Sequence, residues 1–268
     1  MDMQTITPTA ARTSGKELHG LAASPLPPPE AAPDWTVPQH WERFTAADHA
    51  VWDLLFARQV ELLQGRAVSA FHDCLDVLSL SRPGVPDFAE LNAALIARTD
   101  WRVVAVPGLI PDDIFYAHLA KRQFPAGNFI RSADALDYLE EPDVFHDVFG
   151  HVPLLADPAF ADFMETLGHI GLAALARGDL ARVAHLYWRT VEFGLAREDG
   201  ELRIYGAGIL SSFGETRFAL ESEEPQRLDF DLEAAMTTPY RSDRFQDRYF
   251  VLDRFEDVLK LADRKRWG

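Results

Sequence analysis

The stretch Glu141-Pro-Asp-Val-Phe-His146-Asp-Val-Phe-Gly-His151-Val-Pro153 carries the densest chemical signal in the chain. Its two histidines lie five residues apart, whereas a zinc-protease helix places its ligands four residues apart on one face. A five-residue step turns about 140° around a regular α-helix, so both imidazoles could meet one metal only near a bend or an end. Gly150 and Pro153 indicate such an end. The pair is therefore a candidate metal site, with two ordinary helix-end histidines as the alternative.

A third candidate ligand is Glu192, within Leu186-Tyr-Trp-Arg-Thr-Val-Glu192-Phe-Gly-Leu195. A carboxylate among apolar and aromatic neighbours is costly unless it is paired or bound to a cation. A salt bridge to Arg189 is the alternative, and His185, two turns before Glu192, is a rival ligand. Two histidines and one carboxylate leave open metal positions, as in the non-haem iron(II) oxygenases. A zinc hydrolase could use the same ligand types, so residue types alone leave both open.

The composition of the 268 residues limits the kind of site that the chain can build. The single cysteine, Cys74, excludes an intrachain disulfide and argues against a cysteine-based metal site, so histidine and carboxylate must hold any metal. A formal charge of −16 argues against nucleic acid or an anionic membrane as a partner. With no long apolar run and no signal-peptide layout, we expect a cytoplasmic protein, acting as a monomer.

The hydrophobic pattern divides the chain into a tail and one domain. Residues 1–33 contain six prolines and few large aliphatic side chains, which predicts a flexible tail rather than a folded segment. Residues 34–268 show mostly helical periodicity, so we predict a mainly α-helical single domain with a few short β-strands. The expected elements near the candidate site are helices over 134–148, 157–177 and 179–197, strands over 101–106, 201–205 and 249–252, and a glycine-rich turn over 206–208.

Three blocks of the sequence together resemble the signature of the pterin-dependent aromatic amino acid hydroxylases. They are the stretch 141–153, Tyr187-Trp-Arg-Thr-Val-Glu192-Phe-Gly-Leu195 and Tyr205-Gly-Ala-Gly-Ile-Leu-Ser-Ser-Phe-Gly-Glu215. The similarity runs from about Trp101 to the C-terminus, and the chain looks like the short bacterial phenylalanine 4-hydroxylases. The resemblance implies that residues 34–268 form the catalytic domain of an enzyme that converts phenylalanine to tyrosine with Fe(II), O2 and tetrahydrobiopterin or a related tetrahydropterin.

The resemblance also implies roles for individual side chains. His146, His151 and Glu192 match the iron ligands, and Arg131 matches the arginine that pairs with the carboxylate of the substrate. Other matched positions are Tyr138 near the iron, Trp188, Gly208 and Ser211 in the amino acid pocket, and Ile110, Asp112, Phe115, Asp147 and Tyr187 at the pterin site. Core packing is the alternative for the aromatic side chains, and a surface ion pair is the alternative for Arg131.

Three positions depart from the family's pattern. Asp147 stands where animal members carry glutamate, which shortens the reach of any carboxylate contact to the pterin. Leu139 replaces a hydroxyl residue near the substrate, and Pro125 replaces a histidine near the pterin. Three alternatives to a phenylalanine hydroxylase remain: a tryptophan-preferring member of the family, a zinc hydrolase, and a non-enzymatic protein that binds partners through its proline-rich tail.

Overall fold

The computed structural model describes residues 26–137, 141–241 and 244–261, and within them the fold is mainly α-helical with a few short strands, as predicted. The first half contains η1 (Trp41–Arg43), α1 (Ala46–Leu63), α2 (Ser69–Val77), α3 (Phe88–Thr99), β1 (Arg102–Val106), α4 (Asp112–Leu119) and β2 (Gln123–Gly127). The middle contains η2 (Phe145–His151), α5 (Val152–Leu155), α6 (Pro158–Arg177), α7 (Leu180–Tyr187) and η3 (Trp188–Glu192). The last part contains β3 (Leu195–Glu198), β4 (Glu201–Ile204), α8 (Ala207–Leu210), α9 (Phe213–Glu221), β5 (Gln226–Asp229), α10 (Leu232–Thr237), β6 (Arg248–Leu252), η4 (Phe255–Asp257) and α11 (Val258–Leu261).

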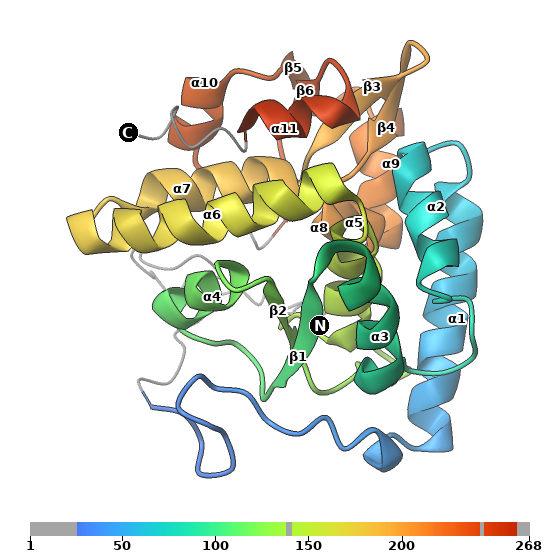
Figure 1. The fold of residues 1–268 in the computed structure, drawn as a ribbon. Helices are drawn as coiled ribbons and strands as arrows, with labels where there is room; N and C mark the ends of the chain where they lie inside the picture. Colours follow the sequence, from blue (N-terminus) through green and yellow to red (C-terminus); the bar gives the residue numbers. More distant parts are fainter. Residues whose placement is uncertain (1–25, 138–140, 242–243, 262–268) are drawn as a thin grey trace, which may run out of the picture.

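Helices α6 and α7 lie side by side across the middle of the molecule, with α4 next to α6 (Figure 1). The side chain of Asp157 caps α6 by accepting a hydrogen bond from the backbone N of Phe160 at 3.0 Å, and Gly178 ends the helix with a φ of 72°. Gly168 lets the backbone of α4 approach closely, because a Cβ there would collide with the backbone N of Ala120. This close packing fixes the position of Phe115 on α4.

The strands form two small sheets. β1 pairs in parallel with β2, and the order in the second sheet is β4-β3-β6-β5. The strands expected over 101–106, 201–205 and 249–252 correspond to β1, β4 and β6. The sequence pattern missed β2 because it contains Pro125. Among the described residues β2 pairs with β1 alone, and proline is tolerated on such an edge strand.

Both segments that carry the candidate ligands are π-helical. In a π-helix the hydrogen bonds run from residue i to residue i+5, so residues five apart lie above one another. His146 and His151, in η2, therefore share one face without the bend or helix end that an α-helix would need. The predicted end at Gly150 is wrong, because η2 continues directly into α5 and Pro153 lies in the first turn of that helix.

Three other predicted boundaries are also wrong. The helix expected over 134–148 is absent from residues 134–137 and 141–143, because the residue before Pro142 is disfavoured in the α conformation and η2 begins only at Phe145. The helix expected over 179–197 ends with η3 at Glu192, and the chain turns into β3 at Leu195. The expected turn over 206–208 is instead the start of α8, with Gly206 at its N-cap.

Gly206 also explains how the two π-helical segments can meet α8. A Cβ on Gly206 would lie 2.5 Å from the carbonyl oxygen of Glu192, and a Cβ on Gly150 would lie 2.8 Å from the carbonyl oxygen of Ala207. The backbone at the start of α8 therefore contacts those of η2 and η3 directly.

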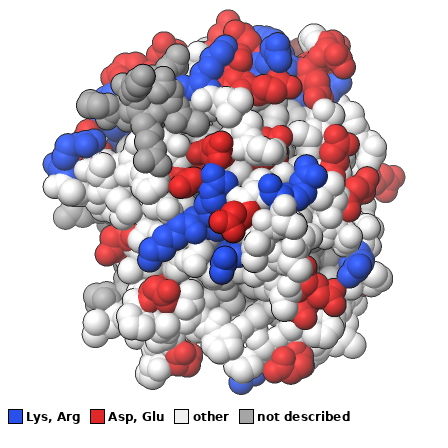
Figure 2. Space-filling model, in the orientation of Figure 1, with Lys and Arg blue, Asp and Glu red and all other residues white. Residues whose placement is uncertain are grey.

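Acidic side chains are spread over the face of the molecule seen in Figure 2. On the face seen in Figure 2, basic side chains lie next to acidic ones instead of forming a separate basic surface. Within the described ranges, no helix combines the length and the apolar character needed to traverse a lipid bilayer.

Candidate functional site

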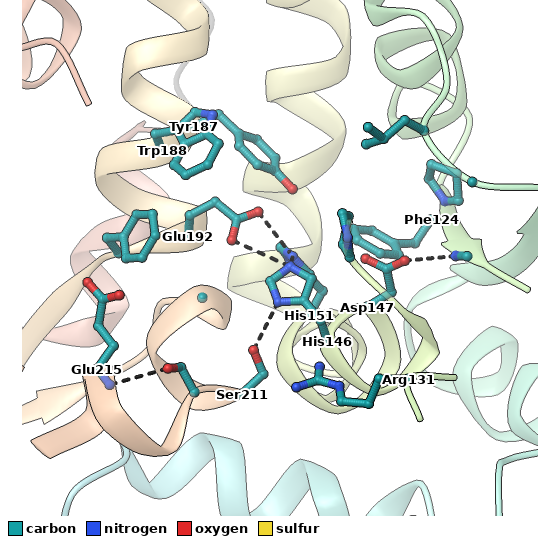
Figure 3. Close-up of a pocket in the computed structure, with 18 of the residues that line it drawn as sticks. Phe124, Arg131, His146, Asp147, His151, Tyr187, Trp188, Glu192, Ser211 and Glu215 are labelled. Carbon is teal, nitrogen blue, oxygen red and sulfur yellow. Dashed lines mark hydrogen bonds and ion pairs between the residues drawn. The ribbon is translucent and has the colours of Figure 1, made fainter. Parts of the chain in front are cut away.

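The side chains of His146, His151 and Glu192 converge on one point between η2 and η3 (Figure 3). The Nε2 atom of His151 lies 3.2 Å from Nε2 of His146 and 3.1 Å from Oε1 of Glu192. Nε2 of His146 lies 3.7 Å from Oε2 of Glu192. Among the described residues, this is the one group of three or more histidine, cysteine or carboxylate side chains close enough to hold a metal ion, with its ligand atoms within 4.8 Å of one another.

Hydrogen bonds fix the orientation of the His146 ring and determine which of its nitrogens carries the proton. Its Nδ1 lies 2.9 Å from the hydroxyl oxygen of Ser211, and that hydroxyl donates its own proton to the carbonyl oxygen of Ala207 at 2.8 Å. The ring therefore donates from Nδ1 to Ser211, which leaves the lone pair of Nε2 facing His151 and Glu192. Burial lowers the pKa of His146 to about 4, which favours the neutral imidazole that binds metals. The donor set fits a divalent transition metal such as iron(II).

The two alternatives raised for Glu192 are excluded by the partners of Arg189 and His185. The buried Arg189 guanidinium donates to the carbonyl oxygens of Arg248, at 2.8 Å, and Pro239, and to the side chain of Gln246. Nδ1 of His185 lies 3.1 Å from the carbonyl oxygen of Met236, so His185 does not join the ligand cluster.

A cavity of about 240 Å³ opens beside the ligand cluster. It brings together most of the side chains that the sequence predicts for the site, namely Ile110, Phe115, Arg131, His146, Asp147, His151, Tyr187, Trp188, Glu192, Gly208 and Ser211. Asp112 lies in the first turn of α4 and does not line the cavity. Tyr138 and Leu139 lie outside the described residues, whereas Pro125 is part of the cavity wall.

Arg131 is held by a carboxylate that the sequence analysis did not single out. Asp143 is fully buried and accepts from Nε of Arg131 at 2.8 Å and from Nη2 at 2.7 Å. Burial alone would raise the pKa of Asp143, but the Arg131 guanidinium outweighs this effect and holds that pKa below its usual value. Asp143 also accepts from the backbone N of His146 at 3.0 Å, so it links the arginine to the ligand helix. The surface ion pair considered for Arg131 is therefore wrong, since this pair is buried.

One side of the cavity, next to β2, combines aromatic rings with a buried acid. The ring of Phe115 meets that of Tyr187 edge-on at a centroid distance of 5.5 Å, and Phe124 lies 4.8 Å from the ring of His151. Asp147 accepts a hydrogen bond from the backbone N of Gly127 at 2.7 Å, and burial raises its pKa to about 7. Phe124 was missed because it belongs to the proline-containing strand.

The other side of the cavity, next to η3, is an aromatic stack. Trp188 stacks on Phe193 at 5.4 Å and on Tyr240 at 4.1 Å between ring centroids. Gly208 leaves room for this stack, because a Cβ there would lie 2.9 Å from the ring of Phe193. Trp188 is therefore both a buried side chain of the core and part of the cavity wall. The contact with Tyr240 could not be foreseen, because the two residues are far apart in the sequence.

Glu215, at the start of α9, is a buried acid of the cavity wall for which the sequence predicts no role. It accepts hydrogen bonds from the hydroxyl of Tyr249 at 2.7 Å and from the backbone N of Gln246 at 3.0 Å. Burial outweighs these hydrogen bonds and raises the pKa of Glu215 from 4.5 to about 7.

The raised pKa of Glu215 predicts a pH-dependent loss of stability. As pH rises from about 4.5 to about 7, the unfolded chain loses this proton while the folded protein keeps it, so the group lowers the free energy of unfolding through this window. The free energy of unfolding of Glu215→Gln, measured in urea relative to that of the unsubstituted protein, is therefore expected to rise by about 2 kcal/mol as the pH is raised from 5 to 8. Glu221→Gln, an exposed change on the same helix, should show no such gain. A difference for Glu215→Gln that is independent of pH would contradict the prediction.

The chain is similar to known proteins over most of its length. The sequence profile of the biopterin-dependent aromatic amino acid hydroxylases matches residues 37–264. A phenylalanine-4-hydroxylase of Caulobacter vibrioides is 56% identical over 245 residues, covering 91% of this chain and 83% of that protein. The crystal structure of Chromobacterium violaceum phenylalanine hydroxylase with bound Fe(III) superposes with a TM-score of 0.84 at 50% identity, covering 87% of this chain and 86% of that one. Another structure of the same enzyme, with iron(III) and 7,8-dihydrobiopterin, gives a TM-score of 0.83 at 51% identity and covers 87% of this chain and 85% of that one. The chain belongs to the biopterin-dependent aromatic amino acid hydroxylases.

Proposed function

We propose that this protein is a phenylalanine 4-monooxygenase, which converts L-phenylalanine to L-tyrosine with O2 and a tetrahydropterin at an iron(II) site. The observation that carries the proposal is the convergence of His146, His151 and Glu192 beside a cavity that a buried arginine also lines. Similar proteins that bear the name phenylalanine-4-hydroxylase cover most of the chain and support the same reaction.

His146, His151 and Glu192 would hold the iron, with Ser211 fixing the ring of His146 through Nδ1. When bound, iron(II) and the tetrahydropterin supply the oxygen activation and the two electrons that hydroxylation of the aromatic ring requires. With these three protein ligands, a bound iron would keep coordination positions open for the reaction. The task of the surrounding residues is to place the substrate beside those positions and to keep bulk water away.

Arg131 would bind the carboxylate of the amino acid, because a guanidinium can make paired hydrogen bonds to that group. Asp143 occupies Nε and one Nη2 hydrogen of Arg131, which fixes the plane of the guanidinium before the substrate arrives. The side of the cavity formed by Trp188, Gly208 and Ser211 would then receive the aromatic ring.

The opposite side of the cavity suits the pterin. We propose that the ring of Phe115 stacks on the pterin, with Ile110, Asp147 and Tyr187 beside it. Asp112 would take part through its backbone at the start of α4, and the role of Tyr138 near the iron stays a prediction. Because Asp147 is anchored to Gly127 on β2, its carboxylate is fixed at the wall of this side.

The domain boundaries form part of the proposal. Residues 1–33 would be a flexible tail, and residues 34–268 would form the catalytic domain. The boundary is supported by the contact between the carbonyl oxygen of Asp34 and Nε2 of His118, at 2.8 Å, and by the burial of Trp35. We further propose a cytoplasmic monomer whose partner is a small aromatic amino acid, with no nucleic acid or membrane partner.

The reaction itself tests the proposal. Protein loaded with iron(II) under anaerobic conditions should form tyrosine when it is given phenylalanine, tetrahydrobiopterin and oxygen. Competition among phenylalanine, tryptophan and tyrosine identifies the preferred substrate, and preference for tryptophan would place the chain in another branch of the family. Iron-loaded protein that forms no hydroxylated product would contradict the proposal. A zinc hydrolase would instead act without oxygen uptake and without the pterin.

A further inference from the structure

Arg58, on α1, contacts two segments of the cavity wall but does not itself line the cavity. Its Nη1 donates to Oδ1 of Asp137 at 2.6 Å, and its Nη2 donates to the carbonyl oxygen of Leu136 at 3.3 Å. Its guanidinium carbon lies 4.9 Å from the ring centroid of Phe213, at the start of α9. Leu136, Asp137 and Phe213 all line the cavity, so Arg58 joins two parts of its wall from behind.

The carbonyl oxygen of Leu136 connects Arg58 to the arginine that we assign to the substrate. Nη1 of Arg131 donates to this same oxygen at 3.3 Å. Two guanidinium groups thus share one acceptor, and each also has its own carboxylate, Asp137 for Arg58 and Asp143 for Arg131. Displacing Leu136 would therefore remove one of the contacts that orient Arg131.

The segment that Arg58 holds has little regular structure of its own. Between β2 and η2 the described residues form no helix or strand, and within 132–137 the backbone makes a single turn hydrogen bond, from Ala135 N to Ser132 O at 3.0 Å. Such a segment depends on side chains from neighbouring elements to fix its position.

Arg58 projects from a firmly attached part of α1. The next residue, Gln59, is buried and donates to the hydroxyl of Thr216 on α9 at 3.0 Å. That hydroxyl donates in turn to the carbonyl oxygen of Ile209 on α8 at 2.7 Å. Because α8 contacts both π-helical segments, Arg58 ties the 132–137 segment to the same rigid frame that carries the candidate metal ligands.

We propose that Arg58 is a positioning residue for the amino acid substrate. It holds Leu136 and Asp137 against Phe213, and through the shared carbonyl oxygen it orients the guanidinium of Arg131. The proposal rests on the function proposed above, in which Arg131 binds the carboxylate of the substrate. Arg58 acts only through these neighbours, so its removal should weaken amino acid binding and leave the pterin side unaffected.

The test is a comparison of Arg58→Met with Arg66→Met. Methionine keeps much of the apolar stem of Arg58 but removes the ion pair and both hydrogen bonds. We expect KM for phenylalanine to rise about threefold to fivefold, with kcat and KM for the tetrahydropterin unchanged. Arg58→Lys keeps the charge opposite Asp137 and should restore part of the loss. Arg66, just beyond α1, pairs with Glu221 at a distance of 2.9 Å, and neither residue lines the cavity. Arg66→Met should therefore leave KM for phenylalanine unchanged.

A second measurement keeps the two proposals separable. Amide hydrogen exchange in peptides covering 132–137 should become faster in Arg58→Met and stay unchanged in Arg66→Met, without any substrate present. If the unsubstituted protein hydroxylates phenylalanine but Arg58→Met keeps its KM and its exchange rates, the positioning role is wrong and the enzymatic function stands. A parallel change in kcat and in both KM values, with a lower melting temperature, would also overturn the positioning role. If the unsubstituted protein does not turn over, the exchange experiment still decides whether Arg58 holds the segment.

Discussion

Glu192→Ala is expected to lose its bound iron and to lower hydroxylation roughly a thousandfold or more. The carboxylate of Glu192 lies within 3.7 Å of both facing imidazole nitrogens, and two histidines alone make a weak site for iron(II). His146→Ala should have the same effect, because it removes another of the three ligand atoms. Metal analysis after desalting, followed by an assay of tyrosine formation, measures both quantities.

His185→Ala is the matched control for the loss of iron. His185 lies on α7, just before η3, but its Nδ1 is engaged by the carbonyl oxygen of Met236. This variant should keep its iron and its activity. Either ligand variant that retained stoichiometric iron and turned over would contradict the ligand assignment.

Arg131→Lys is expected to lower kcat/KM for phenylalanine by about a hundredfold while the bound iron stays in place. Lysine carries the charge that the buried Asp143 needs, so the protein is not left with an isolated buried carboxylate. A single ammonium cannot make paired hydrogen bonds to Asp143 and also face the substrate carboxylate, which costs about 3 kcal/mol of binding. Steady-state kinetics with phenylalanine and with the tetrahydropterin varied separately measure the effect.

Arg122→Lys provides the control for a change of arginine to lysine within an ion-pair network. Arg122 pairs with Asp162 and Glu165 on α6 and does not line the cavity. Its substitution should leave kcat/KM within about twofold of the unsubstituted protein. The role of Arg131 would be wrong if Arg131→Lys had an unchanged KM for phenylalanine.

The residue types at the candidate metal site could be predicted from the sequence, but their geometry could not. One cysteine in the chain directed attention to histidine and carboxylate, and His146, His151 and Glu192 do lie together. The five-residue spacing predicts a helix end only for a regular α-helix, and η2 is π-helical. A π-helical turn depends on packing against α8, which the spacing of two residues does not reveal.

The partners of the site residues were even less accessible to sequence analysis. Asp143 lies twelve residues from Arg131, and nothing in the local pattern tells that both are buried. Arg58 and Leu136 are separated by 78 positions, and their contact exists only because α1 packs beside the cavity. One error was avoidable, since Pro142 already argued against a helix through the preceding residues.

If Arg131 binds the substrate carboxylate as proposed above, its buried pair with Asp143 has a consequence for the molecules that the pocket would accept. Asp143 balances the positive charge of Arg131 within the protein, so this pair presents an oriented dipole to an arriving ligand. A zwitterionic amino acid is itself neutral overall and has opposite poles, so it matches such a field by alignment. An anionic analogue of the amino acid lacks the ammonium group. It would lose the interaction of that group, and the balanced ion pair would offer it no net attraction in return. In the proposed function, the pair would therefore select a ligand by the direction in which the ligand's charges point, and because the pair is buried, the ionic strength of the solution would have little influence on this choice.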